Sequence, residues 1–146
     1  VLAMKNIIRL KPKEKAMISL IISVNEDEEK YKGTFKYNQI MSLVNAYSRN
    51  MILNIDLIKK IVSCVCKKYE VDAVYLFGSY AKNKAKGDSD IDLMIVSKID
   101  GIIYYQLINE LETNLNKKID LIRLETAVQN VKLMNEILKD GIKIYG

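Results

Sequence analysis

The stretch that decides the fold is Leu76–Leu93, which reads LFGSYAKNKAKGDSDIDL. An apolar run enters a turn of small residues at Gly78 and Ser79, and a second apolar run opens with Asp90 and Asp92. The pattern predicts a strand, a turn, a short helix and a second strand. Glycine lets the backbone approach a phosphate, and the free amides of a helix start attract anions. Two carboxylates spaced two apart on a strand point to one face and can share metal ions.

This combination of groups suits nucleotidyl transfer from a metal-bound triphosphate. An acceptor hydroxyl attacks the α-phosphate, and two metal ions can stabilise the attacking and leaving oxygens, so several carboxylates must meet at one end of a sheet. Asp90 and Asp92 supply two, and Asp120, which opens the next predicted strand, is the candidate for the third. We expect these three to be catalytic residues and metal ligands. The cofactor should be Mg²⁺ or Mn²⁺, because those ions prefer oxygen ligands.

Three residues of the turn and helix are candidates for nucleotide binding. Gly78 and Ser79 are expected to hold the β- and γ-phosphates through backbone amides and the serine hydroxyl. Lys82, one turn further on, has two interpretations that the sequence leaves open: it neutralises phosphate charge, or it is a solvated helix lysine. Phe77 and Tyr80 have the size to stack on a base, but packing is the more ordinary role of such side chains.

The same stretch resembles the nucleotidyltransferase superfamily that includes DNA polymerase beta, and within it the minimal nucleotidyltransferases. Their usual pattern is Gly-Ser-Tyr-Ala-Arg-Gly-x-Ala, a few residues, and then Ser-Asp-Ile-Asp-Leu. The departures here are Lys82, where arginine is usual, and Asn83, where a second glycine is usual; lysine keeps the charge but loses bidentate reach to phosphate. The positions that match in register are Gly78, Ser79, Tyr80, Ala81, Ala85, Ser89, Asp90, Ile91, Asp92 and Leu93.

The resemblance extends from about Asn54 to the end of the chain and implies a polymerase beta-like core, ATP as substrate and Asp120 as the third acid. Minimal nucleotidyltransferases of this type resemble the antitoxin half of HEPN/MNT toxin–antitoxin pairs. In those pairs the enzyme places AMP from ATP on a tyrosine of its partner, a helical ribonuclease with a catalytic histidine. The resemblance therefore implies a protein adenylyltransferase with a HEPN-family partner. Since this chain has no histidine, it is not that partner.

Other activities stay open at this point. The chain could be a nucleotide-binding antitoxin that neutralises its partner by occlusion, without turnover. It also resembles antibiotic nucleotidyltransferases, although those usually have a larger second domain for the drug. A template-dependent polymerase needs further domains to hold nucleic acid, for which 146 residues leave little room, so nucleic acid is not the expected substrate.

Composition narrows the chemistry further. The absence of histidine removes His-based general base catalysis, Ser-His-Asp triads and most His-ligated zinc or iron sites. Apolar residues make up 49% of the chain and charged residues 28%, which is a soluble globular profile. No apolar run approaches the roughly 18 residues of a membrane span, and no secretory signal pattern opens the chain, so we expect a cytoplasmic protein. The net charge of +5 does not decide between partners.

The pattern divides the chain at about residue 50. Residues 51–146 alternate between helical and strand-like runs, which predicts an α/β domain with a small mixed sheet and helices packed on it. We expect strands at 71–77, 90–97, 119–124 and 142–145, and helices starting at Asn54, at Gly101 and at Thr126, the last running through Leu138. We expect residues 1–50 to form a mainly helical N-terminal appendage, which is either a recognition or dimerisation element or a pad over the core.

Overall fold

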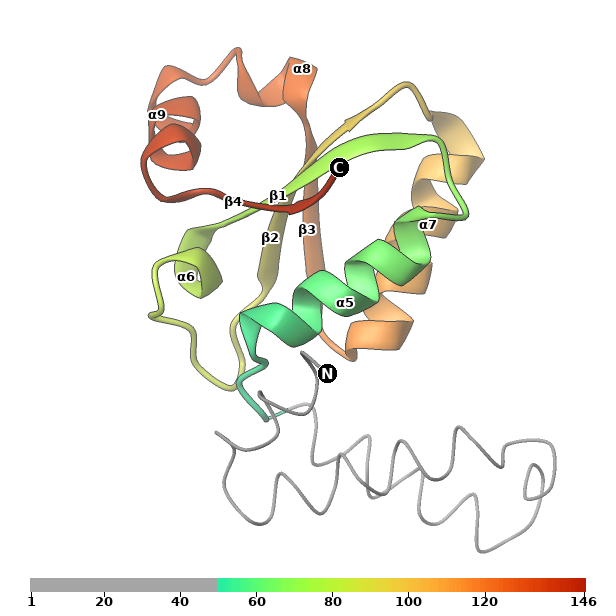
Figure 1. Cartoon of the computed structure of the whole chain (residues 1–146). Helices are drawn as coiled ribbons and strands as arrows, with labels where there is room; N and C mark the ends of the chain where they lie inside the picture. Colours follow the sequence, from blue (N-terminus) through green and yellow to red (C-terminus); the bar gives the residue numbers. More distant parts are fainter. Residues whose placement is uncertain (1–49) are drawn as a thin grey trace, which may run out of the picture. The chain divides into compact units, whose positions relative to one another are not determined.

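The structure, a computed structural model, describes residues 50–146 (Figure 1). The predicted appendage over residues 1–50 lies outside the described residues, apart from Asn50, so its role stays a prediction. Among the described residues, no helix is long and apolar enough to cross a membrane. The elements, in chain order, are α5 (Ile55–Cys66), β1 (Val71–Phe77), α6 (Gly78–Ala81), β2 (Ile91–Ser97), α7 (Gly101–Leu115), β3 (Ile119–Arg123), α8 (Leu124–Ala127), α9 (Val131–Asp140) and β4 (Ile142–Tyr145).

The four strands form one mixed sheet in the order β3-β2-β1-β4. β1 pairs antiparallel with β2 and with β4, whereas β2 and β3 run parallel. The parallel pair needs a crossover connection, which α7 provides. This arrangement confirms the predicted α/β fold with a small mixed sheet. Two strand boundaries differ from the prediction: β2 begins at Ile91 and leaves Asp90 in the preceding loop, and β3 ends at Arg123 rather than at residue 124.

The longer helices α5 and α7 cover one face of the sheet. The apolar row of β2, Ile91, Leu93 and Ile95, is buried on this face. It packs with the apolar sides of the two helices, where Ile58 and Leu107 are fully buried. Asn54 caps α5 as expected, since its Oδ1 accepts a hydrogen bond from the N–H of Asp56 at 2.8 Å.

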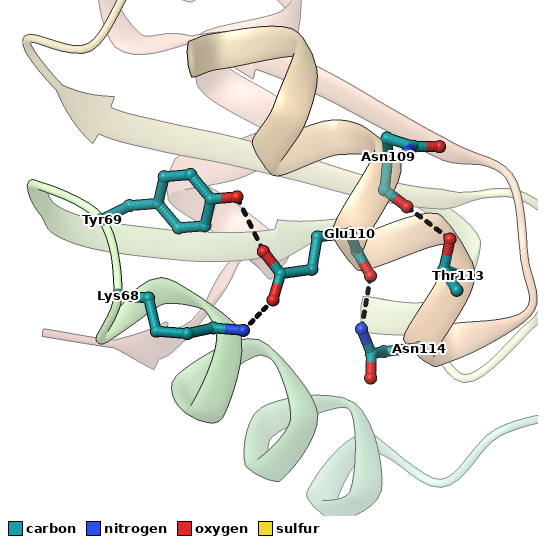
Figure 2. Close-up of polar contacts among 6 residues, drawn as sticks. All are labelled: Lys68, Tyr69, Asn109, Glu110, Thr113 and Asn114. Atoms are coloured by element: carbon teal, nitrogen blue, oxygen red, sulfur yellow. Dashed lines mark hydrogen bonds and ion pairs between the residues drawn. The ribbon is translucent and has the colours of Figure 1, made fainter. Parts of the chain in front are cut away.

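A polar contact joins the end of α5 to α7 (Figure 2). The Tyr69 hydroxyl donates to Glu110 Oε2 at 2.7 Å, and the Lys68 ammonium pairs with the other oxygen of the same carboxylate. Farther along α7, Asn114 donates back to the Glu110 carbonyl at 2.7 Å. These contacts hold the helical layer together at the end of α5, away from its N-terminal cap.

The short helix α6 and the last helices, α8 and α9, lie on the opposite face of the sheet (Figure 1). A second core cluster forms beneath α8 and α9 from Phe77 of β1, Met94 of β2, Ala127 of α8 and Ile137 of α9. The sheet is therefore buried on both faces. Since α6 and α9 contact each other, this face also brings the Gly-Ser turn next to the last helix.

The prediction of one continuous last helix from Thr126 was wrong. The chain forms two helices, and Thr126 lies inside the first of them rather than at a cap. The second begins after Asn130, whose Oδ1 accepts from the N–H of Leu133 at 3.1 Å. Asparagine favours such a cap over a helix interior because its side chain bonds the nearby free amides.

Candidate active site

Two of the three predicted acids face each other across the parallel strands. The register pairs Asp92 of β2 with Asp120 of β3. Paired residues on adjacent strands project to the same face of a sheet. Two residues further along each strand, Met94 and Ile122 pack into the cluster beneath α8 and α9, which identifies the face. Asp92 and Asp120 therefore lie side by side on the α6, α8 and α9 face of the sheet.

The third acid, Asp90, lies in the loop just before β2 rather than in the strand. Its side chain is 42% exposed, and Lys118 Nζ lies 3.8 Å from its Oδ2. Lys118 is itself 70% exposed, so solvent weakens this ion pair. The pairing of β2 with β3 begins at Ile91 and does not include Asp90. The position of Asp90 therefore depends on the conformation of the loop before β2.

Negative charge is concentrated around Asp92. Burial, followed in order by the charges of Asp120, Asp90 and Glu136, raises the pKa of this carboxyl to about 6. Asp90 and Asp120 thus both act electrostatically on Asp92. Such a cluster disfavours the ionised state of its most buried member unless a cation is present.

The chemistry of this donor set fits a hard divalent cation such as Mg²⁺ or Mn²⁺, since it consists of carboxylate oxygens and the chain has no histidine. Within residues 50–146, no three His, Cys, Asp or Glu side chains are arranged closely enough to hold an ion as they stand. Asp92 and Asp120 would be the central ligands and Asp90 the peripheral one.

Gly78 places the start of α6 directly against Asp92. Its φ is +71°, which is in the left-handed region that favours glycine. A Cβ atom at this position would lie only 2.0 Å from Asp92 Oδ2. Both the backbone angle and the space therefore require glycine. Ser79 follows in the first turn of α6, whose start has no side-chain cap. Because Gly78 lies against Asp92, the predicted phosphate-binding turn and the acid pair belong to one site.

Asn83, which stands where the family pattern usually has a second glycine, suits the local backbone conformation. Asn83 has a φ of 57°, again in the left-handed region, where asparagine is among the better tolerated residues. The chain folds back here, because the N–H of Lys84 donates to the Ser79 carbonyl at 2.8 Å. Asparagine thus serves in place of the glycine usual in the related pattern.

Lys82 has a partner that the sequence did not indicate. Its Nζ donates to Glu136 Oε1 of α9 at 2.5 Å, and this hydrogen bond raises the pKa of the lysine. The solvated-lysine interpretation misses this partner, and the role of Lys82 toward phosphate stays a prediction. Glu136 is also one of the charges that raise the pKa of Asp92. Lys82 and Glu136 are 54 residues apart, and no spacing rule links them.

Phe77 and Tyr80 pack into the protein rather than standing free to stack on a base. Tyr80 is only 3% exposed, and its hydroxyl oxygen accepts a hydrogen bond from the Leu53 N–H at 3.4 Å. Phe77 belongs to the core cluster beneath α8 and α9. The packing interpretation of these two residues is confirmed.

A strand, a glycine turn against a carboxylate and a facing acid on a parallel strand are the parts expected of a nucleotidyltransferase core. The family model described as "Polymerase beta, Nucleotidyltransferase" matches residues 59–146, which is more than half of the chain. The chain belongs to this family. The match spans every strand of the sheet and all six candidate residues, and the predicted resemblance to polymerase beta-like nucleotidyltransferases is confirmed.

Named relatives are similar over the same part of the chain. A Methanocaldococcus jannaschii protein, whose name describes a candidate protein adenylyltransferase, is 30% identical over 91 residues, covering 61% of this chain and 92% of the relative. The protein adenylyltransferase MntA of Shewanella oneidensis is 28% identical over 79 residues, covering 53% of this chain and 55% of MntA. A chain in a crystal structure described as a toxin–antitoxin with AMP-PNP has 26% identity and a TM-score of 0.51, with 64% of this chain and 74% of that chain covered.

Proposed function

We propose that this nucleotidyltransferase moves AMP from ATP to a hydroxyl group of a partner protein, and that Asp90, Asp92 and Asp120 are its acids. The observation that carries the proposal is the pairing of Asp92 with Asp120, with the Gly78 backbone against the first of them. The names of the relatives, which are protein adenylyltransferases, support the transferred group. AMP-PNP in a similar solved structure supports an adenine nucleotide as substrate.

Each residue has a defined task in this proposal. The amides at Gly78 and Ser79 and the serine hydroxyl hold the β- and γ-phosphates at the start of α6. Asp92 and Asp120, with Asp90 as the peripheral ligand, would hold the divalent cation, which would supply charge stabilisation to the attacking and leaving oxygens when bound. The acceptor hydroxyl releases its proton to solvent and its oxygen forms a bond to the α-phosphorus, while the bond from that phosphorus to the bridging oxygen breaks, so that pyrophosphate leaves. Lys82 exchanges Glu136 for phosphate and offsets part of the charge.

The proposed acceptor is a tyrosine of a HEPN-family toxin. The described domain has only 97 residues, 50–146, which form a single sheet with its helices. A domain of this size has little room to enclose a second small molecule, so the acceptor is expected to bring its own surface to the acids. The similar solved structure is described as a toxin–antitoxin, which supports a protein partner.

Intact-mass measurement of the co-encoded neighbour tests this function. The neighbour is incubated with the full chain, ATP and Mg²⁺, and we expect its mass to rise by whole AMP groups. A neighbour that binds the chain but keeps its mass would favour neutralisation by occlusion. Comparable transfer to an aminoglycoside or to tRNA would overturn the choice of acceptor.

Removal of divalent cations is expected to stop transfer completely. The candidate ligands are carboxylates, and without a cation their charges repel one another and the triphosphate. Excess chelator should abolish product formation, and added Mg²⁺ or Mn²⁺ should restore it, whereas Zn²⁺ should not. Full activity in chelator would rule out the assigned role of the acids.

Replacing Ser79 with alanine is expected to weaken ATP binding more than it slows the bound reaction. A hydrogen bond to a charged group contributes about 1.5–3 kcal/mol, which corresponds to roughly a tenfold to hundredfold rise in the dissociation constant. Thr113→Ala serves as the control, because it removes an exposed hydroxyl from α7 on the other face of the sheet. Unchanged ATP affinity in Ser79→Ala would remove this residue from the phosphate site.

A further inference from the structure

Lys117 is a buried lysine that the proposed reaction does not use. It lies in the turn between α7 and β3 and is 8% exposed. Its Nζ donates to the Gly87 carbonyl oxygen at 2.5 Å, and burial lowers the pKa of the ammonium. An ammonium withdrawn from water is unfavourable unless it is well hydrogen-bonded. The hydrogen bond to Gly87 is therefore part of the folded core rather than an incidental contact between exposed side chains.

Gly87 lies in a small turn that leads directly into Asp90. The turn closes on itself, since the N–H of Ser89 donates to the Lys86 carbonyl at 3.1 Å and the N–H of Lys86 donates to Ser89 Oγ at 2.8 Å. These hydrogen bonds fix the conformation of residues 86–89, but they lie within the turn and do not connect it to the sheet. Lys117 bonds to the middle of this turn from the start of β3.

The neighbouring Lys118 meets the same loop in a different way. Its carbonyl accepts the N–H of Ile91 at 3.0 Å, which begins the pairing of β2 with β3. Its side chain is 70% exposed and faces the Asp90 carboxylate at 3.8 Å. Lys117 is buried and donates a hydrogen bond to the loop backbone. Lys118 is exposed, and its ammonium faces the Asp90 carboxylate.

We propose that Lys117 is a positioning residue for Asp90. It ties the turn of residues 86–89 to the start of β3, and β3 carries Asp120, so the loop acid stays at a set distance from the acids on the strands. A ligand on a loop contributes to metal binding in proportion to how well the loop is ordered beforehand. The anchoring follows from the contacts alone, whereas the benefit to metal binding rests on the proposed function.

Lys118 offers a matched control with the opposite expectation. A divalent cation bound to Asp90 replaces the ammonium of Lys118 as the partner of that carboxylate. Removing the Lys118 charge should therefore leave cation binding unchanged or make it tighter. The two adjacent lysines have the same charge, so a general electrostatic effect would act on both variants alike.

Hydrogen exchange in the metal-free full chain tests the anchoring. In Lys117→Met the amides of residues 86–91 should exchange about tenfold faster, because the methionine keeps the buried volume but loses the hydrogen bond. Lys117→Arg, which retains a donor, should recover most of the protection, and Lys118→Met should match the unaltered protein. Unchanged protection in Lys117→Met would overturn the proposal.

Binding of Mn²⁺, followed by electron paramagnetic resonance, tests the positioning. We expect about tenfold weaker binding in Lys117→Met, recovery in Lys117→Arg, and no weakening in Lys118→Met. A loosened turn with unchanged Mn²⁺ affinity would overturn the positioning role. An unaltered protein that binds no Mn²⁺ would overturn the metal assignment of the proposed function and this role with it, while the exchange data would still decide the anchoring.

Discussion

Replacing Gly78 with alanine is expected to reduce nucleotidyl transfer at least a hundredfold and to destabilise the domain. The added Cβ would lie 2.0 Å from Asp92 Oδ2, so the carboxylate has to move. A displacement of about 1 Å at a reacting centre can reduce a rate by about a hundredfold. In addition, the φ of +71° strains any residue with a Cβ, which costs about 1–2 kcal/mol of stability.

Gly101→Ala separates the two effects. Gly101 also has a left-handed φ, of +56°, but a Cβ there would meet nothing within 4 Å. This variant should therefore lose a similar backbone contribution to the free energy of unfolding and keep normal transfer. Denaturant unfolding and transfer rates of both variants give the comparison. Transfer by Gly78→Ala within tenfold of the unaltered rate would contradict the placement of Gly78 against a catalytic acid.

Replacing Asp92 with asparagine is expected to abolish transfer, with a loss of at least a hundredfold, or about 2.7 kcal/mol in the barrier. Asp92 is the most central acid, because it faces Asp120, borders Gly78 and is affected by the charge of Asp90. Asparagine keeps the shape but loses the charge that would hold a cation. A loss below tenfold in single-turnover rates would count against a role as metal ligand.

The same variant should be more stable than the unaltered protein when no metal is present. Asp92 has a pKa of about 6 in the fold against an ordinary value of 3.8, so the unfolded chain releases its proton first as the pH rises. Stability is therefore lost between about pH 4 and pH 6, and asparagine avoids this loss. With solvent screening, the gain at pH 7 should be on the order of 1 kcal/mol and should vanish below about pH 4.

Thermal unfolding in chelator, at pH 7 and at pH 4, measures this gain. Asp72→Asn is the control, since Asp72 is an exposed carboxylate near the other end of β1. That variant should show neither the gain nor its pH dependence. An Asp92→Asn protein that is less stable than the unaltered one at pH 7 would mean that its carboxylate is paired favourably rather than strained.

The local parts of the fold could be predicted from the sequence because short-range patterns determine them. The apolar run of Val71–Phe77 predicted β1 with the bounds that the structure has, and the pattern after residue 100 predicted the start of α7 at Gly101. The pairing of Asp92 with Asp120 needed one further step, the assumption that the two strands are neighbours, which the related family pattern supplied.

The remaining features depend on contacts between distant segments. The partner of Lys82 is Glu136, on a helix whose position no local pattern indicates. Lys117 bonds to the Gly87 carbonyl, 30 residues away, and no spacing rule links the two positions. The break before α9 depends on whether Asn130 caps a helix or continues one, and the periodicity of that region allowed both.

Transfer from ATP labelled at either the α- or the γ-phosphate tests the central claim most directly. The full chain is incubated in parallel with each label, Mg²⁺ and its co-encoded partner, and the partner is isolated. We expect the α-label on the partner and the γ-label only in released pyrophosphate, with neither label transferred by Asp92→Asn. The γ-label on the partner would indicate phosphoryl transfer instead, and neither label on a partner that binds the chain would contradict catalysis by this site.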